Sequence, residues 1–524
     1  MYKYILEEGK MIKSKIVRDT VLLTAMQLFL DTGALLLNVF ITKKLGASAI
    51  GILSLMGSFL GLAGILSNGN AFLCTSRFVS EELGKKGGSP EGILAHAVKL
   101  CLLLSAVVSA AVFTFAKPIS LRFFSGADMT SAIRLMPIAL VTGAVSACLK
   151  GYFNACRRAG ITAAGEIAEF VTRCGVIAGA ALMEASPNES RVCSIMTGGM
   201  IAGNVVSMLL LSVTFLKQHR KRHGSCSLSF VRYASLCFPI MGGSLLTAIL
   251  SSTNDTLIPI CQRQHGDSTA EALSKFGIFE AIVIPAIFFP SVVLCSMSGI
   301  IVSETARAKA AEDSTRIRSF TERIIAWTLM FSVFSAAVIM RFGRQLGELL
   351  GGGELAGSMI TLIAPVIPFI YMEIVLEAII KGMGLQSFSS VNYLIEYVIR
   401  ISAVLILIPH IGFYGVVISY YASNIFGNCS RYIKATKSAG ARRALCGTIL
   451  LPMLLAGVTM TVGEMFLKLT KTGEKTVFSM LMYTILWGTA YFSIFCSLGK
   501  VKLFCKSGED VFSDTAQQTT GCVR

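Results

Sequence analysis

Charged side chains inside long apolar runs are the residues of this sequence whose types and spacing could do chemistry. A charge at membrane depth costs roughly 2.5–3.5 kcal/mol on insertion scales, so such residues normally face a bundle interior or a wet cavity. Two Glu-x-x-x-Arg motifs meet this description, Glu169 with Arg173 and Glu396 with Arg400. A guanidinium can bind two phosphate oxygens at once, so these residues are candidates for lining a cavity that receives a phosphate. The alternative interpretation is an ion pair within each helix, because residues four apart share a helix face.

Two aspartates, Asp31 and Asp255, lie in apolar runs that begin the two halves of the chain. A desolvated carboxylate at such a place can take up a proton or Na⁺, so both are candidate ion-coupling residues. The alternative is a carboxylate held by hydrogen bonds from a neighbour such as Thr32 or Asn254. Asn38 and Asn254 are further candidates for the polar lining of the cavity.

No catalytic arrangement accompanies these charges. The fifteen cysteines include no C-x-x-C pair and the five histidines no H-E-x-x-H motif, so we expect neither a metal nor a cofactor. No Ser/His/Asp constellation is visible, and no sizeable soluble loop could bind a nucleotide sugar, so we expect a transporter rather than an enzyme. Arg77 follows an apolar run within a charged segment, and it is predicted to be a gate residue or part of a surface helix.

The composition requires long apolar helices to position these side chains. Of the 524 residues, 54% are hydrophobic and 15% are charged, whereas soluble domains carry about 25% charged residues. Apolar runs of about 20 residues, the length that crosses a bilayer as a helix, recur about fourteen times. The predicted fold class is an all-α polytopic membrane protein with about 14 transmembrane helices.

Basic residues gather in alternate gaps between the apolar runs. The net charge is +17, and with the N-terminus inside, Lys and Arg on the cytoplasmic side outnumber those outside more than twofold. We therefore predict a multi-pass plasma-membrane protein with both termini cytoplasmic and its basic loops beside anionic membrane lipids. Nucleic-acid binding is not expected, because it needs a basic face on a soluble module. The predicted cytoplasmic loops include 217–222, 307–323 and 431–443.

The chain contains an internal repeat. I-A-E-F-V-T-R at 167–173 and L-I-E-Y-V-I-R at 394–400 are 227 positions apart, and Lys150 and Lys381 each precede a glycine upstream. Six spans per half would give two parallel six-helix bundles that rock around a substrate path, with two extra C-terminal spans. The predicted organisation is a cytoplasmic N-terminus (1–19), a first bundle (20–216), a basic linker (217–233), a second bundle (234–436), two additional spans (437–497) and a cytoplasmic tail (498–524).

The segments that carry the repeat also resemble a known family. L-K-G-Y-F-N-A followed by I-A-E-F-V-T-R (149–173), T-S-R-F-V-S-E-E-L-G-K-K (75–86) and I-P-H-I-G-F-Y-G-V-V-I-S (408–419) are similar to sequences of the stage V sporulation protein B-like polysaccharide flippases. These belong to the multidrug/oligosaccharidyl-lipid/polysaccharide (MOP) superfamily. The resemblance covers the first twelve or so spans. It implies alternating-access flipping of a lipid-linked oligosaccharide across a bacterial cytoplasmic membrane, for envelope or spore-cortex assembly.

One departure from the family keeps a second function open. Many of these relatives place arginines in the first helix, where this sequence has Asp31 and Asn38. The MATE branch of the superfamily can use a first-helix acid to couple export to H⁺ or Na⁺. A cation-coupled exporter of organic cations is therefore the alternative function. About fourteen spans favour the flippases, because MATE exporters usually have twelve.

Overall fold

The computed structural model describes residues 25–83, 88–123, 129–183, 189–218, 228–441, 451–461, 464 and 477–497. These residues form helices joined by short turns, without a strand among them, so the predicted all-α fold class is confirmed. Ten helices within these ranges are long and apolar enough to cross a membrane, so the count of about fourteen spans stays a prediction. The predicted N-terminus (1–19), tail (498–524) and most of the linker (217–233) lie outside the described residues.

Contacts divide the chain into two compact units. Unit 1 comprises Met1–Ala286, Leu350–Gly352 and Arg400–Ser419, and unit 2 comprises Ile287–Leu349, Gly353–Ile399 and Tyr420–Arg524. The predicted bundles follow the repeat in the sequence, whereas these units follow packing, so the predicted bundle boundaries stay a prediction. Each unit is described separately below.

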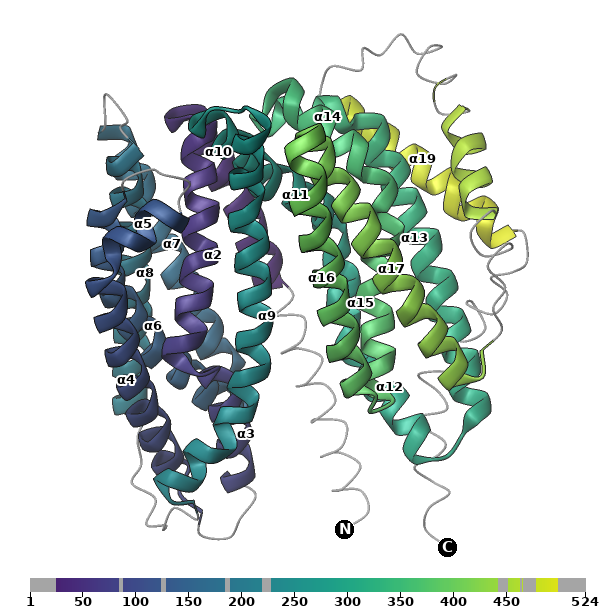
Figure 1. The fold of residues 1–524 in the computed structure, drawn as a ribbon. Helices are drawn as coiled ribbons and strands as arrows, with labels where there is room; N and C mark the ends of the chain where they lie inside the picture. Colours follow the sequence, from purple (N-terminus) through teal and green to yellow (C-terminus); the bar gives the residue numbers. More distant parts are fainter. Residues whose placement is uncertain are drawn as a thin grey trace, which may run out of the picture. The chain divides into compact units, whose positions relative to one another are not determined.

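Unit 1 contains a long series of helices that run side by side (Figure 1). The helix α2 is delimited by two glycines with positive φ, Gly46 at 95° and Gly69 at 58°, and Gly69 donates its N–H to the carbonyl of Ile65 as a helix C-cap. Up to residue 283, the elements of unit 1 are Ala25–Leu45, α2 (Ala47–Asn68), α3 (Ala71–Leu83), α4 (Pro90–Thr114), α5 (Ala116–Phe123), α6 (Thr130–Ala155), α7 (Ala159–Met183), α8 (Glu189–Gln218), α9 (Phe230–His265), α10 (Thr269–Ile278) and the π-helix η1 (Phe279–Val283).

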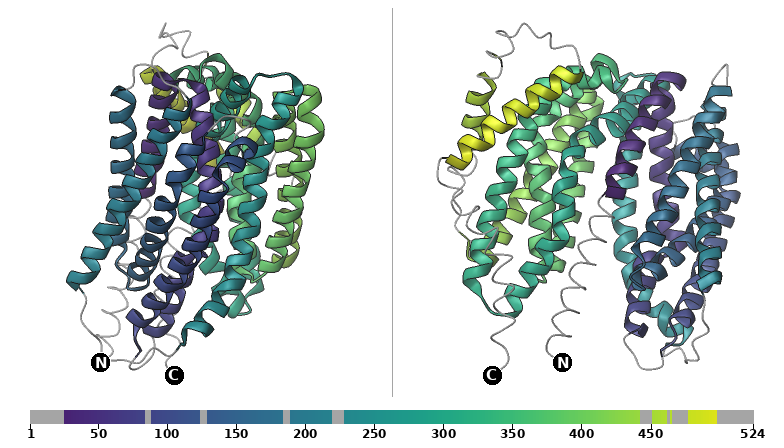
Figure 2. Two further views of the ribbon diagram at one scale, coloured as in Figure 1. Left: turned by 60° about the vertical axis from the view of Figure 1, so that its left-hand side comes forward. Right: turned by 180° about the vertical axis from the view of Figure 1, so that it is seen from behind.

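Within unit 1, α2 packs against α4, α6, α9 and α10, and Figure 2 shows this bundle from two further sides. The contact with α10 is made by backbone, because a Cβ at Gly51 would lie 2.0 Å from the carbonyl oxygen of Leu273. A Cβ at Gly277 would likewise lie 2.2 Å from the nitrogen of Gly51. Glycine is therefore required at this crossing, since no side chain fits between the two helices.

Unit 2 has a core formed by aromatic side chains. Trp487, with 1% of its surface exposed, donates its indole N–H to the hydroxyl of Thr459 at 2.8 Å. The hydroxyl of Tyr491 donates to the carbonyl of Met330 at 3.1 Å, so the helix of Tyr491 is fixed to the helix of Met330.

The elements after η1 are α11 (Ile284–Phe288), η2 (Phe289–Ser291), α12 (Val292–Ala310), α13 (Ser314–Leu349), α14 (Gly353–Ile363), η3 (Ala364–Val366), α15 (Ile367–Gly382), α16 (Gln386–Ile411), α17 (Phe413–Ala439), Leu451–Thr461 and α19 (Val477–Ser497). Residues 400–419, which belong to α16 and α17, are part of unit 1.

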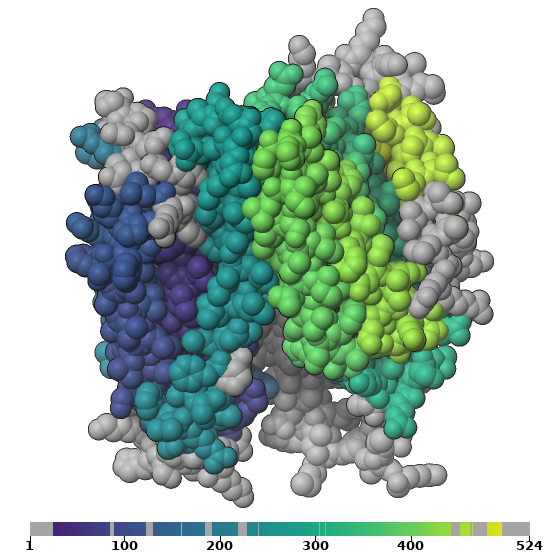
Figure 3. Space-filling model, viewed as in Figure 1, coloured from purple at the N-terminus to yellow at the C-terminus, as the bar shows by residue number. Residues whose placement is uncertain are grey.

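Large apolar side chains cover much of the outer surface. On α4, Val107 is 70% exposed and Phe113 is 56% exposed; this helix contributes to the dark blue surface in Figure 3. On α16, Val391 and Val398 are each more than half exposed. Exposure of this kind on helices long enough to span a bilayer is what a hydrocarbon environment requires. The protein is a multi-pass membrane protein.

Candidate functional site

Two pockets in unit 1 share the helix α2 as a wall. Ser54 and Ser58 face one pocket, Gly64 and Asn68 face the other, and Gly57 and Gly61 line both. The two sets arise because residues three or four apart share a face of a helix. The pockets have volumes of about 370 Å³ and 350 Å³.

The glycines of this shared wall leave room instead of allowing close packing. A Cβ built on Gly57, Gly61 or Gly64 would meet no heavy atom within 4 Å, in contrast to Gly51 on the same helix. The pockets are therefore separated at this place by helix backbone, without an intervening side chain.

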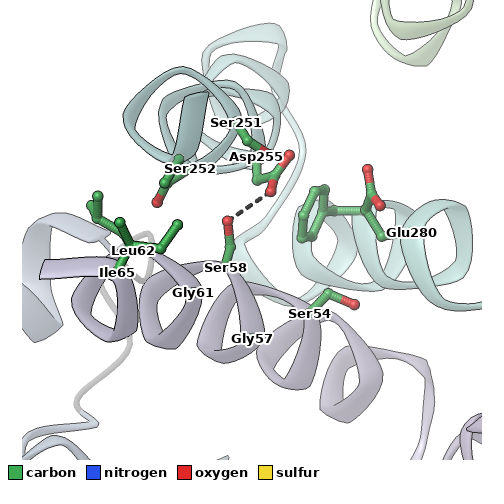
Figure 4. Close-up of a pocket in the computed structure, with 12 residues that line it drawn as sticks. Ser54, Gly57, Ser58, Gly61, Leu62, Ile65, Ser251, Ser252, Asp255 and Glu280 are labelled. Carbon is green, nitrogen blue, oxygen red and sulfur yellow. Dashed lines mark hydrogen bonds between the residues drawn. The ribbon is translucent and has the colours of Figure 1, made fainter. Parts of the chain in front are cut away.

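The pocket that Ser54 and Ser58 face, here called the acidic pocket, contains two carboxylates. Asp255 of α9 accepts hydrogen bonds from the hydroxyl of Ser58 at 2.7 Å and from the side-chain amide of Asn254 at 3.2 Å. Figure 4 shows Ser58 and Asp255 meeting between α2 and α9, with Glu280 on the neighbouring helix. Its polar lining residues are Ser54, Ser58, Ser251, Ser252, Asp255 and Glu280.

A π-helix carries Glu280 in this pocket. The segment η1 (Phe279–Val283) follows α10 directly, and π-helical turns within α-helices are frequent at functional sites. Asn38, predicted to line the cavity, donates its side-chain amide to the carbonyl of Ala281 at 2.8 Å. Asn38 thus satisfies a backbone acceptor of the π-helix, and it lines neither pocket. Sequence periodicity does not reveal a π-turn, so this arrangement could not be predicted.

The pocket that Gly64 and Asn68 face, here called the basic pocket, contains one charged side chain among its described lining residues. Arg173 of α7 lies there with Asn68 of α2 and Asn204 of α8. The amide of Asn204 donates to the carbonyl of Ala139 at 3.1 Å, which fixes its orientation. These side chains supply hydrogen-bond donors and a positive charge, the combination that an anion requires.

Glu169 does not neutralise Arg173. Its carboxylate lies 2.8 Å from the ammonium of Lys150 on α6. Arg173 makes no ion pair with any residue that the structure describes, and its guanidinium carbon lies 5.4 Å from the centroid of the Phe170 ring. The interpretation as an ion pair within α7 is therefore wrong for this motif. A contact between two helices cannot be inferred from spacing within one of them.

A buried ionic cluster in unit 2 escaped the sequence prediction. Arg431 is predicted in a cytoplasmic loop, but it lies within α17 with 1% of its surface exposed, so a loop is wrong for this residue. The side of the membrane stays a prediction. Its guanidinium nitrogens lie 2.9 Å from Glu396, 3.2 Å from Glu373 and 3.5 Å from Glu377. Glu377 also pairs with Lys381 at 3.3 Å. One arginine thus joins α15, α16 and α17.

An extension of the repeat would have pointed to Arg431. I-A-G-N at 201–204 matches I-F-G-N at 425–428, which aligns Ser207 with Arg431. The earlier match of Lys150 with Lys381 aligns Ser146 with Glu377. In unit 1 the hydroxyl oxygens of Ser146 and Ser207 lie 3.0 Å apart. The two halves thus place a neutral pair and an ionic pair at equivalent positions.

The other predicted site residues occupy varied places. Arg400 interacts electrostatically with Asp255. Asp31 accepts a hydrogen bond from the amide of Gln27 at 2.8 Å and lines neither pocket. Arg77 is exposed and lies 3.1 Å from Glu81 one helical turn away, as a surface helix would place it. The functional roles predicted for these residues stay predictions.

The chain was compared with family models, with curated proteins and with solved structures. No family model matches the chain. In sequence it is 19% identical over 421 residues to stage V sporulation protein B of Bacillus subtilis (strain 168), covering 77% of this chain and 80% of that protein. In structure it resembles the lipid II flippase MurJ in an inward closed conformation, with a TM-score of 0.70 over 91% of this chain and 99% of MurJ at 13% identity. The chain therefore shares the fold of this flippase.

A second structural likeness lies in the drug-exporting branch. An inward-facing MATE multidrug resistance transporter of the MOP superfamily gives a TM-score of 0.59 over 78% of this chain and 94% of that chain, at 15% identity. The resemblance inferred from the sequence motifs is thereby confirmed. The MOP fold is shared by flippases and exporters, so the fold alone does not specify the substrate.

Proposed function

We propose that this protein flips an anionic lipid-linked sugar intermediate, a polyprenyl phosphate or diphosphate, across the cytoplasmic membrane by alternating access. The observation that carries the proposal is Arg173, which faces a 350 Å³ pocket while the acid of its own motif bonds to Lys150. An arginine without an ion-pair partner among the described residues is expensive at membrane depth unless an anionic ligand uses it. The likeness to stage V sporulation protein B and to MurJ supports the same substrate class.

The surroundings of Arg173 suit the headgroup of such a lipid. Asn68 and Asn204 add amide groups to the pocket lining, and Ser67 adds a hydroxyl. Glycine and alanine form much of the remaining lining, so few large side chains occupy the space beside Arg173. The function places the chain in envelope or spore-cortex assembly, with both termini in the cytoplasm, and Asp31 and Asp255 remain the proposed ion-coupling residues.

The test is a flipping assay in proteoliposomes. A lipid-linked disaccharide is incorporated in both leaflets, and its accessibility to a membrane-impermeant sugar-modifying enzyme is followed with and without the protein. We expect the protected fraction to become accessible with the full-length protein, and Arg173→Ala to reduce the rate at least tenfold. Arg232→Ala, an exposed arginine at the start of α9, is the matched control and should flip at the normal rate. Normal flipping by Arg173→Ala would disprove the phosphate contact.

The acidic pocket favours a second candidate function, an exporter of organic cations of the MATE type. Asp255 and Glu280 in a 370 Å³ pocket could bind a small cation directly. The same vesicles, given a fluorescent cation and a proton or Na⁺ gradient, distinguish the two functions. Export of the dye that Asp255→Asn abolishes, with no movement of the lipid-linked disaccharide, would favour the exporter.

A further inference from the structure

Three charged side chains lie on one face of α7. Glu169 follows Glu166 by three residues and precedes Arg173 by four, and residues at these spacings share a helix face. Arg173 lines the basic pocket, whereas neither glutamate does. The net charge that the pocket offers to a ligand therefore depends on where these two carboxylates are held.

A lysine from the neighbouring helix α6 holds one of the two carboxylates. The ammonium of Lys150 lies 2.8 Å from the carboxylate of Glu169, and the two side chains are 16% and 23% exposed. Because both are mostly buried, water and salt screen their attraction only weakly. Lys150 also interacts electrostatically with Glu166. Lys150 lines neither pocket, so any effect that it has on the basic pocket is indirect.

Backbone packing fixes both partners of this ion pair. A Cβ at Gly151, next to Lys150, would lie 2.6 Å from the carbonyl oxygen of Phe72 in α3, so this contact sets the rotation of α6 about its axis. A Cβ at Gly203 of α8 would lie 2.7 Å from the carbonyl oxygen of Glu169. Close contacts at two glycines thus hold Lys150 and Glu169 in the positions in which they meet.

Without Lys150, Glu169 has a second cation within reach on its own helix. A glutamate and an arginine four residues apart are neighbours on a helix surface and attract each other, so Glu169 can turn to Arg173. Glu166 cannot do the same, because it lies seven residues from Arg173, about 10.5 Å along the helix axis. The pairing of Glu169 therefore decides whether a carboxylate opposes the guanidinium of Arg173.

The second half of the chain also binds the equivalent glutamate across helices. Glu396, which aligns with Glu169 in the repeat, lies 2.9 Å from Arg431 of α17. The cation comes from α6 in the first half and from α17 in the second, so the two halves reach the same pairing with different residues. Pairing of this glutamate with another helix is thus a property of both halves.

We propose that Lys150 is a positioning residue that keeps the basic pocket cationic by holding Glu169 away from Arg173. The proposal rests on the proposed function, because it takes Arg173 as the anion contact. When Lys150 is absent, Glu169 bonds to Arg173, and an anionic headgroup must displace this carboxylate before it can bind. Lys150 thus determines the affinity for the anion without touching it.

The test measures binding of radioactive inorganic diphosphate to the full-length protein in lipid nanodiscs. Each isotherm gives the affinity and the number of sites separately, so a loss of folded protein lowers the number of sites and leaves the affinity unchanged. We expect Lys150→Met to bind diphosphate about tenfold more weakly than the normal protein, because a carboxylate now competes for Arg173. Lys117→Met, an exposed lysine on α5, is the matched control and should bind normally. Normal affinity in Lys150→Met would overturn the proposal.

A second substitution separates this role from a structural one. In Lys150→Met with Glu169→Gln the competing carboxylate is absent, so the affinity for diphosphate should return to normal. In Lys150→Met with Glu166→Gln the affinity should stay low, because the acid that is removed cannot reach Arg173. Failure of both double variants to recover would mean that Lys150 acts by direct contact or by packing. Equal recovery in both would mean that only net charge matters, and either result would contradict the proposal.

The same isotherms separate this inference from the proposed function. If the normal protein does not bind diphosphate, or if Arg173→Gln binds it equally well, the phosphate contact fails and the role of Lys150 fails with it. If Arg173→Gln loses diphosphate binding while Lys150→Met keeps the normal affinity, the proposed function stands and the role of Lys150 alone is overturned.

Discussion

Arg431 illustrates how much the surroundings of one residue determine its role. Lys and Arg near the end of an apolar run usually mark a cytoplasmic loop, and Arg431 is predicted in one. In the structure it is buried, with Glu373, Glu377 and Glu396 around it. The sequence contains the carboxylates, but their convergence depends on how α15, α16 and α17 pack, which spacing along one helix does not specify.

Removal of Arg431 should destabilise unit 2 strongly. In Arg431→Met, the buried Glu396 and the partly exposed Glu373 lose the cation that pairs with them, and Glu377 keeps only Lys381. Breaking a buried ion pair costs about 3–5 kcal/mol. We expect a clearly lower midpoint of thermal unfolding in detergent, measured by the fluorescence of the two tryptophans. Lys437→Met, an exposed lysine on the same helix, is the matched control and should unfold normally. Equal stability of the two variants would mean that the cluster is not held by Arg431.

Arg173 shows the opposite relation between sequence and structure. Its type and its place in an apolar run suffice to select it as a cavity residue, and it lies at a pocket. Its partner could not be predicted, because the choice between an ion pair in α7 and the contact of Glu169 with Lys150 depends on α6. The sequence thus suffices to select Arg173 as a cavity residue, whereas the partner of Glu169 can be known only once the helices are packed.

At the scale of elements, the repeat explains why the Arg431 cluster can be replaced. Glu373 and Glu377 align with Thr142 and Ser146, and Arg431 aligns with Ser207. The first half packs the same positions without these charges, so helix packing does not demand them. The triple variant Glu373→Thr, Glu377→Ser, Arg431→Ser should therefore recover most of the stability that Arg431→Met loses. In it, Lys381 becomes available to Glu396, as Lys150 is to Glu169 in the first half. A triple variant as unstable as the single one would contradict this equivalence.

Glycines in α2 have two different roles. Gly51 allows close contact with α10, whereas Gly57 leaves open space at the pockets, and substitution with alanine can distinguish the two roles. A Cβ at Gly51 meets the backbone of α10, whereas a Cβ at Gly57 meets open space. Gly57→Ala should stabilise the protein by roughly 0.5–1 kcal/mol, because alanine restricts the unfolded chain. Gly51→Ala should destabilise it by about 1–3 kcal/mol, because α2 and α10 must move apart. Thermal unfolding of the two variants side by side is the measurement, and similar midpoints would disprove the distinction.

For the whole molecule, the fold class can be predicted from the sequence, whereas the boundaries of the packed units cannot. Apolar runs of bilayer length predict an all-α membrane protein because helices satisfy their own backbone in hydrocarbon, and the structure confirms this. Bundle boundaries drawn from the repeat follow chain symmetry, whereas packing assigns Phe230–His265 to unit 1. Two sequence segments can be related by symmetry and still belong to different packed units, because the repeat relates segments by sequence whereas the units follow the contacts between helices.

The side of the membrane on which each terminus lies remains a prediction that can be tested for the whole chain. An even number of spans puts both termini on the same side, and the excess of Lys and Arg in alternate loops puts that side in the cytoplasm. A green fluorescent protein fused to the C-terminus should therefore fluoresce, because it folds in the bacterial cytoplasm. Alkaline phosphatase fused at the same place should be inactive, because it needs the oxidising exterior to form its disulfides. A dark first fusion with an active second one would mean an odd number of spans or an inverted chain, and a phosphatase fused at the N-terminus would distinguish these two cases.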